Sequence, residues 1–154
     1  MPASNNSTYL TVPELFENNT VLAFSTRKGG CSEPPLSSLN FSTSQGDSQE
    51  NVRENFRILT RALGVTPQGI VTCRQVHSDN VEVLSSVPPA PPVADALMTT
   101  KAGVFLGIKT ADCLPVLLLD SNRGVAAAVH AGWRGTVLRL TRKVVRLMKT
   151  EFGS

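Results

Sequence analysis

The strongest constraint on the fold is a series of short apolar runs in the C-terminal half of the chain. Each run is bounded by polar residues or glycine. They are Ala96–Met98, Val104–Ile108, Pro115–Leu119 and Val125–Val129. Short apolar runs without polar alternation are typical of strands that are buried on both faces. We therefore expect these runs to form one core sheet.

Helical periodicity predicts two helices that flank this sheet. Asp47 and Glu50 resemble a capping box, after which apolar residues recur at helical spacing over Gln49–Leu63 until Gly64. Thr136–Lys149 carries apolar residues on one face and basic residues on the other. The predicted fold class is α/β (α+β), a mixed β-sheet with flanking helices.

The remaining segments add strands, turns and one long loop. Val21–Ser25, Ile70–Val76 and Val81–Leu84 are predicted strands, and His77 stands at the end of the second. Four prolines between Ser85 and Pro92 predict an internal loop over residues 85–93, because proline cannot donate to a sheet ladder. We treat residues 1–154 as a single domain. Because the last helix covers only one face of so apolar a sheet, the fold is expected to be incomplete.

Apolar length and cysteine content indicate in which cell compartment the protein is expected. The chain has 154 residues, and no apolar stretch reaches the roughly 20 residues that span a bilayer. The polar start at Pro2–Thr8 lacks the order of a signal peptide. The odd cysteine count (Cys31, Cys73 and Cys113) argues against a disulfide framework. We expect a cytoplasmic protein without a membrane partner.

Positive charge is concentrated near the C-terminus. Net charge is +3, and six basic residues fall between Arg134 and Lys149. No aromatic residue interleaves them, so a solvated helix face is favoured over a surface that binds nucleic acid. We expect no nucleic-acid partner.

Three metal-ligating side chains stand at the edges of predicted strands: His77, Cys113 and His130. Neighbouring strands of a sheet can bring their ends within a few ångströms. Two imidazoles and a thiolate leave one tetrahedral position open, as in catalytic zinc sites. The alternative is that Cys113 is a small buried hydrophobe, and spacing alone leaves the two interpretations balanced because no close ligand pair is present.

Several ordered segments of the chain resemble one family. They are "FSTRKGG" (24–30), "SLN" (38–40), "GD" (46–47), "QVHS" (75–78), "ADAL" (94–97), "TADCLPVLL" (110–118) and "HAGWRGT" (130–136). This order is similar to that of the YfiH-like purine nucleoside phosphorylases, laccase-domain proteins formerly called multicopper polyphenol oxidases. Family domains continue well beyond the position of Ser154, so the chain resembles their N-terminal portion.

The resemblance implies a fold, a cofactor and an activity. The fold would be YfiH-like, similar to that of the cytotoxic necrotizing factor toxins. The histidine of "QVHS", the cysteine of "TADC" and the histidine of "HAGW" would bind Zn²⁺, which here means His77, Cys113 and His130. The implied activity is phosphorolysis of adenosine, inosine and S-methyl-5′-thioadenosine, with adenosine deamination in the same family. The implied partners are a purine nucleoside and phosphate, and a homodimer is left open.

Further residues are candidates for substrate binding. Arg27 on a glycine-containing loop and Arg134 at a predicted helix start can attract phosphate, with surface salt bridges as the alternative. Asn40 and Gln75 can hydrogen-bond a nucleoside or satisfy buried backbone at a turn. Asp112 can orient a ligand histidine or act as a cap.

Other functions compete with a zinc phosphorylase. A metal-free cysteine hydrolase would use Cys113 as nucleophile and His130 as base. A copper-dependent polyphenol oxidase ranks low, because a multicopper centre needs more than the two histidines present. An inactive binding module is the third alternative.

Overall fold

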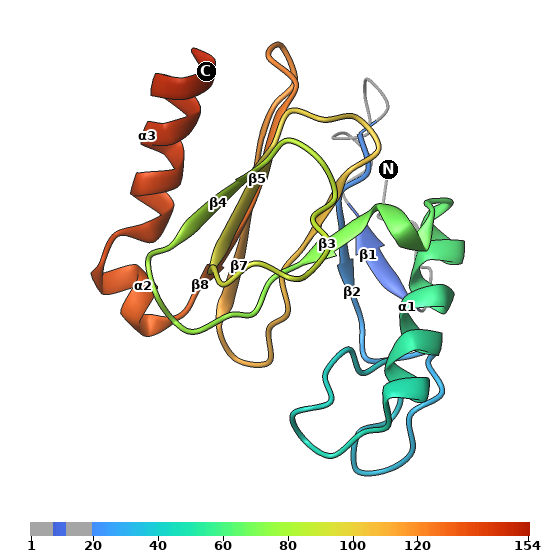
Figure 1. Cartoon of the computed structure of the whole chain (residues 1–154). Helices are drawn as coiled ribbons and strands as arrows, with labels where there is room; N and C mark the ends of the chain where they lie inside the picture. The colour runs from blue at the N-terminus through green and yellow to red at the C-terminus, as the bar shows by residue number, and fades with distance from the viewer. Residues whose placement is uncertain (1–7, 12–19) are drawn as a thin grey trace. The chain divides into compact units, whose positions relative to one another are not determined.

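The computed structural model describes residues 8–11 and 20–154, and the chain divides into two compact units (Figure 1). The units are Met1–Pro67 and Gln68–Ser154. Of the polar start, only Thr8 lies within the described residues. Each unit is described by itself.

The first unit contains a two-stranded sheet and one helix. Strand β1 (Tyr9–Thr11) pairs antiparallel with β2 (Ala23–Ser25), and helix α1 spans Gln49–Leu63. Strand β2 is shorter than predicted, and β1 was not predicted from the sequence.

Helix α1 has the predicted bounds but a different N-terminal cap. The hydroxyl of Ser48 accepts a hydrogen bond from the N–H of Asn51 at 3.0 Å. Asp47 instead accepts the N–H of Ser48 at 2.9 Å. Gly64 ends the helix with φ +68°, a conformation that glycine adopts without steric cost. The predicted cap was one residue early because aspartate and serine are both favoured caps and only backbone geometry separates them.

The second unit is built on a four-stranded sheet. Its order is β4 (Val81–Leu84), β5 (Ala96–Thr99), β8 (Val125–Ala131) and β7 (Leu114–Asp120). Strands β4 and β5 are parallel, whereas β8 is antiparallel to both of its neighbours. The central strands β5 and β8 carry the most buried residues of the sheet.

One predicted core strand pairs elsewhere. Strand β6 (Phe105–Gly107) pairs in parallel with β3 (Ile70–Thr72) in a separate two-stranded sheet. A single core sheet was therefore the wrong expectation for this run, because apolar character indicates burial without naming a pairing partner. Strand β7 also departs from the expectation, since its residues are only partly buried.

Both faces of the central strands are covered. Helix α3 (Leu140–Phe152) lies along one face (Figure 1), where Leu140 and Val144 pack with Met98. On β5, Leu97 belongs instead to a second cluster that includes Val71 of β3. The second face is thus covered by segments earlier in the chain, which corrects the expectation that nothing covers it.

The predicted C-terminal helix is broken into two. Helix α2 spans Trp133–Val137, and Arg139 with φ +59° separates it from α3. Val137 is 71% exposed, so it lies off the packing face on which the sequence pattern placed it. The residues that pack are Leu140, Val144 and Met148, at a spacing of four.

The proline-rich segment forms a loop between β4 and β5. Within it, the carbonyl of Pro92 accepts the N–H of Arg74 at 2.8 Å, and Val93 forms an isolated bridge with Arg74. This contact holds the chain just ahead of the turn that contains His77.

Candidate metal centre

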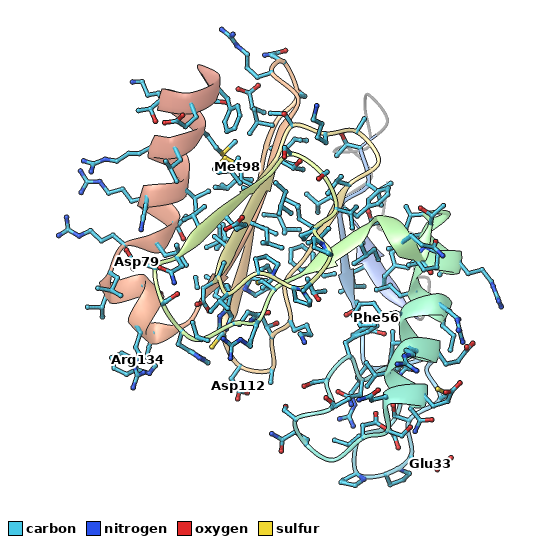
Figure 2. All side chains as sticks on the ribbon, in the orientation of Figure 1. Glu33, Phe56, Asp79, Met98, Asp112 and Arg134 are labelled. Carbon is cyan, nitrogen blue, oxygen red and sulfur yellow. The ribbon has the colours of Figure 1, made fainter. Side chains whose placement is uncertain are left out.

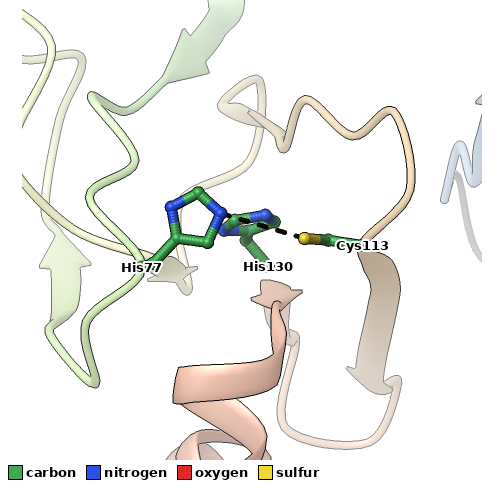
Figure 3. A group of neighbouring side chains, drawn as sticks. All are labelled: His77, Cys113 and His130. Carbon is green, nitrogen blue, oxygen red and sulfur yellow. Dashed lines mark hydrogen bonds between the residues drawn. The ribbon is translucent and has the colours of Figure 1, made fainter.

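Three side chains from distant parts of the second unit meet at one place (Figure 3). His77, Cys113 and His130 each offer one donor atom, and these atoms lie within 4.8 Å of one another. The sulfur of Cys113 is 3.9 Å from Nε2 of His77, and the two imidazole centroids are 4.9 Å apart. The three residue types suspected from the sequence are therefore brought together.

Strand pairing places Cys113 beside His130. In the antiparallel ladder of β7 and β8, Pro115 lies opposite His130 and Leu114 opposite Ala131. Cys113 directly precedes β7 and so lies at the same end of the sheet as His130. His130 itself lies within β8, one residue before its end, and is only 4% exposed.

His77 is held by a turn instead of a strand. Strand β3 ends at Thr72, so the predicted strand over Ile70–Val76 is too long. His77 has φ +58°, a left-handed conformation that is uncommon for residues other than glycine. It is exposed to solvent, in contrast to His130.

Asp95 fixes this turn, although it was not among the candidate site residues predicted from the sequence. Its side chain is fully buried. One carboxylate oxygen accepts the N–H of His77 at 3.0 Å, and the other accepts the N–H groups of Val76 at 3.2 Å and Ser78 at 2.7 Å. The hydroxyl of Ser78 also donates to Asp95, at 2.8 Å. The signal that could have pointed to Asp95 is its place in the "ADAL" segment at the start of a buried strand.

The same carboxylate contacts the buried histidine. Nδ1 of His130 lies 2.8 Å from Oδ1 of Asp95. Burial raises the pKa of Asp95, but hydrogen bonds from His130 and Ser78, with the N–H of Val76, outweigh it and leave the pKa below its ordinary value. Ionised Asp95 is therefore suited to accept a hydrogen bond from a protonated Nδ1, which leaves Nε2 of the neutral His130 ring with a free lone pair.

Asp112 does not occupy the place suggested for it. It is exposed in the turn before Cys113, and no hydrogen bond to its side chain is found among the described residues. The carboxylate that contacts His130 is instead that of Asp95, which is buried and directly precedes β5.

Gly132 leaves room at the centre of the cluster. A Cβ atom at this position would lie 3.0 Å from Cδ2 of His77 and 3.2 Å from the sulfur of Cys113. Gly132 has φ −68°, a backbone conformation that other residues also adopt. Its missing side chain matters for space and not for backbone freedom.

The residues fit a metal ion such as zinc. Bonds of about 2.0–2.3 Å at tetrahedral angles place neighbouring donors about 3.5 Å apart. The 3.9 Å between Cys113 and His77 is close to that spacing. Two nitrogens and one sulfur also match the ligand types that zinc prefers. This group can therefore hold a metal ion.

The four candidate substrate residues are less closely tied to the cluster. In the second unit, Gln75 exchanges two hydrogen bonds with the backbone of Lys109, at 2.7 and 2.9 Å, and Arg134 lies exposed with its guanidinium 5.2 Å from the Trp133 ring centroid. In the first unit, Arg27 donates to the carbonyl of Ser37 at 2.8 and 3.1 Å. These contacts are structural, and substrate binding stays a prediction for all four. Asn40, also in the first unit, donates from its side-chain amide to the carbonyl of Ser42 and to the carboxylate of Asp47, at 2.7 Å each.

Helix length also bears on membrane association. Figure 2 shows the side chains of the part of the chain that the structure describes. In this part, no helix is both long and apolar enough to cross a bilayer.

The sequence and the fold both match one protein family. The family model described as multi-copper polyphenol oxidoreductase laccase matches residues 21–154, and the chain belongs to this family. A solved structure, YlmD from Geobacillus stearothermophilus, superposes with a TM-score of 0.88 at 30% sequence identity, covering 97% of this chain and 59% of the other. A second solved structure, the hypothetical protein YfiH of Bacillus licheniformis, superposes with a TM-score of 0.90 at 28% sequence identity, covering 97% of this chain and 59% of the other. The fold is therefore YfiH-like, as expected from the sequence.

Curated relatives carry enzyme names. The chain is 38% identical over 138 residues to a purine nucleoside phosphorylase of Bacteroides thetaiotaomicron, covering 84% of this chain and 51% of the relative. It is 37% identical to the adenosine deaminase RL5 of an unknown prokaryotic organism, covering 83% and 53%. The chain thus spans about half the length of the curated relatives it matches.

Proposed function

We propose that this chain binds Zn²⁺ through His77, Cys113 and His130 and contributes the metal centre of a purine nucleoside phosphorylase. The observation that carries the proposal is that three donor atoms from separate segments lie within 4.8 Å of one another. The proposed substrates are phosphate with adenosine, inosine or S-methyl-5′-thioadenosine, supported by the name of the relative from Bacteroides thetaiotaomicron.

Phosphorolysis sets demands that the chain's residues can meet. A phosphate oxygen bonds to C1′ of the ribose while the bond from C1′ to the base breaks, and the base leaves with a proton. A bound zinc ion supplies Lewis acidity. Arg134 is exposed on α2, which follows His130 closely, and is proposed to attract phosphate. Arg27 is proposed for the same role, because its guanidinium can also attract phosphate.

Deamination of adenosine is the second candidate, because one relative is named an adenosine deaminase. A cysteine hydrolase that pairs Cys113 with His130 has less support, since the histidine within hydrogen-bonding distance of Cys113 is His77. A copper oxidase remains the weakest alternative, because the chain has two histidines.

The proposed setting is the cytoplasm, with no nucleic-acid or membrane partner. An inactive binding module stays an alternative to the enzyme, and ligand binding without turnover would favour it. A homodimer is left open, and the mass of the protein in solution tests it.

One assay separates these functions. Base release and inosine formation are measured on adenosine, inosine and S-methyl-5′-thioadenosine, with and without phosphate, on protein of known zinc content. We expect free base only when phosphate is present. Inosine from adenosine would instead establish deamination, and turnover that survives complete chelation would favour the cysteine hydrolase.

Single substitutions connect the activity to the cluster. Cys113→Ala, His77→Ala and His130→Ala are each expected to lose stoichiometric zinc and turnover together. Cys31→Ala is the matched control, because Cys31 is exposed in the first unit. Equal zinc content in Cys113→Ala and Cys31→Ala would contradict the proposed ligand set.

A further inference from the structure

We propose that Asp95 is a positioning residue that prepares two of the three ligands for the metal, by setting the tautomer of His130 and by building the turn that presents His77. The proposal rests on the proposed metal binding for its functional meaning, but the tautomer can be measured in metal-free protein. The two can therefore fail separately.

Asp95 gathers the backbone of the turn at His77. Three successive backbone N–H groups, from Val76 to Ser78, point at one buried carboxylate. Backbone N–H groups can only donate, so the group that they surround must accept. These hydrogen bonds hold His77 in its left-handed conformation, which has an intrinsic steric cost. Without Asp95, the turn loses the contacts that compensate for this cost.

Asp95 also contacts the imidazole of His130. Oδ1 of Asp95, which accepts from His77, also lies 2.8 Å from Nδ1 of His130. A carboxylate in this position favours a proton on Nδ1, and the neutral ring then has its lone pair on Nε2. Only that tautomer can bind a metal through Nε2. The backbone supports the same placement, because the N–H of His130 donates to the carbonyl of Asp95 at 2.7 Å.

Replacing the carboxylate by an amide exposes this dependence. In Asp95→Asn, an amide oxygen can face Val76 and Ser78 only if the NH₂ group faces His130. The NH₂ group would then donate to Nδ1 and move the ring proton to Nε2, which removes the metal-binding lone pair. In the opposite orientation, the NH₂ group would face two donors of Ser78, its N–H and its hydroxyl. Neither donor would then have an acceptor, so this orientation is less favourable.

The primary experiment is ¹⁵N NMR of the metal-free wild-type protein with labelled histidine. The chain has only two histidines, so His77→Gln assigns both rings. At a pH where the rings are neutral, we expect His130 to carry its proton on Nδ1. A proton on Nε2 of His130 would overturn the proposal, whether or not the protein binds zinc.

The second experiment measures zinc affinity by competition with a chelator. Loss of a residue that orients a ligand histidine typically lowers metal affinity by about 10- to 100-fold. We expect a loss of that size in Asp95→Asn, together with the tautomer change. Glu82→Gln is the matched control, an exposed carboxylate on β4 in the same unit. Wild-type zinc affinity in a folded Asp95→Asn protein would overturn the proposal.

A milder variant guards against loss of the fold, because Asp95 is fully buried. Ser78→Ala removes one hydrogen bond to the same carboxylate and leaves the N–H contacts. It is expected to keep the His130 tautomer and to lower zinc affinity by less than Asp95→Asn. If Asp95→Asn does not fold, the wild-type tautomer decides, and a proton on Nε2 in Ser78→Ala would also contradict the proposal.

Discussion

Gly132 has no side chain at the position where one would enter the metal centre. A Cβ atom there would crowd His77 at 3.0 Å and Cys113 at 3.2 Å, both closer than ordinary van der Waals contact. At the residue scale, the space for an ion depends on this glycine as well as on the three donors. The family segment "HAGW" contains it between His130 and Trp133, although spacing alone does not reveal its purpose.

Gly132→Ala is therefore expected to weaken zinc binding. Overpacking typically costs about 1–3 kcal/mol, which corresponds to a loss of affinity of about 5- to 150-fold. Zinc affinity is measured by chelator competition, as for the wild-type protein.

Gly107→Ala provides the matched control. It adds a methyl group in the same unit but outside the cluster, where the nearest atom is Cγ2 of Thr72 at 3.1 Å. Zinc affinity in Gly107→Ala is expected to match that of the wild-type protein. A Gly132→Ala protein with unchanged affinity would show that the cluster has more room than these contacts allow.

At the element scale, hydrogen bonds from side chains join the loop before α1 to the helix itself. Asp47 accepts from Ser32 at 2.6 Å, from Asn40 at 2.7 Å and from Asn51 at 3.0 Å. The fully buried Asn55 connects the N–H of Cys31 to the same network. These contacts hold the segment that follows β2 against α1.

The charge of Asp47 gives this network a pH dependence. Hydrogen bonds from Ser32, Asn40 and Asn51 lower the pKa of Asp47 from 3.8 to about 2. Because the folded-state pKa lies below the unfolded one, the stabilisation is complete above about pH 4 and is lost as pH falls toward 2. Asp47→Asn should therefore lower the midpoint of denaturant unfolding at pH 7, with a difference that shrinks between pH 4 and pH 2.

Glu33→Gln is the control for this pH series, since Glu33 is exposed in the same unit. Its midpoint is expected to follow that of the wild-type protein at each pH. A deficit in Asp47→Asn that is equally large at pH 2 would indicate that the ionised carboxylate is not what stabilises the network.

At the scale of the whole molecule, the metal centre belongs entirely to one compact unit. The three donors and Asp95 all lie within Gln68–Ser154. Their segments converge because strand pairing places the start of β5, the end of β8 and the start of β7 at the same end of the sheet. The proposed metal binding is therefore expected to be linked to folding of this unit.

This linkage predicts that zinc stabilises the chain. A ligand present at 100 times its Kd adds about 2.7 kcal/mol to the free energy of unfolding when it binds only the folded state. We expect an increase of that order in denaturant unfolding of the wild-type protein with zinc. His77→Gln should lose most of it while keeping its metal-free stability, because His77 is exposed. An equal increase in both proteins would place the zinc elsewhere.

Local pattern in the sequence was sufficient for the main elements. The bounds of α1 and β4 were predicted correctly, because caps, periodicity and strand-forming runs are short-range signals. The three donor residues were also selected from their chemistry and from family resemblance, and the structure brings them together. Sequence periodicity alone did not separate α2 from α3, since the break depends on one left-handed residue, Arg139.

The sequence by itself determined which residues are apolar, which can bind a metal and where α1 begins and ends. Only the tertiary structure decided that β6 pairs with β3, that Asp95 and not Asp112 contacts His130, and that Gly132 faces the centre. The physical reason is that such contacts join residues far apart in the chain. Their partners are set by strand register and packing, whereas caps and periodicity act within a few residues.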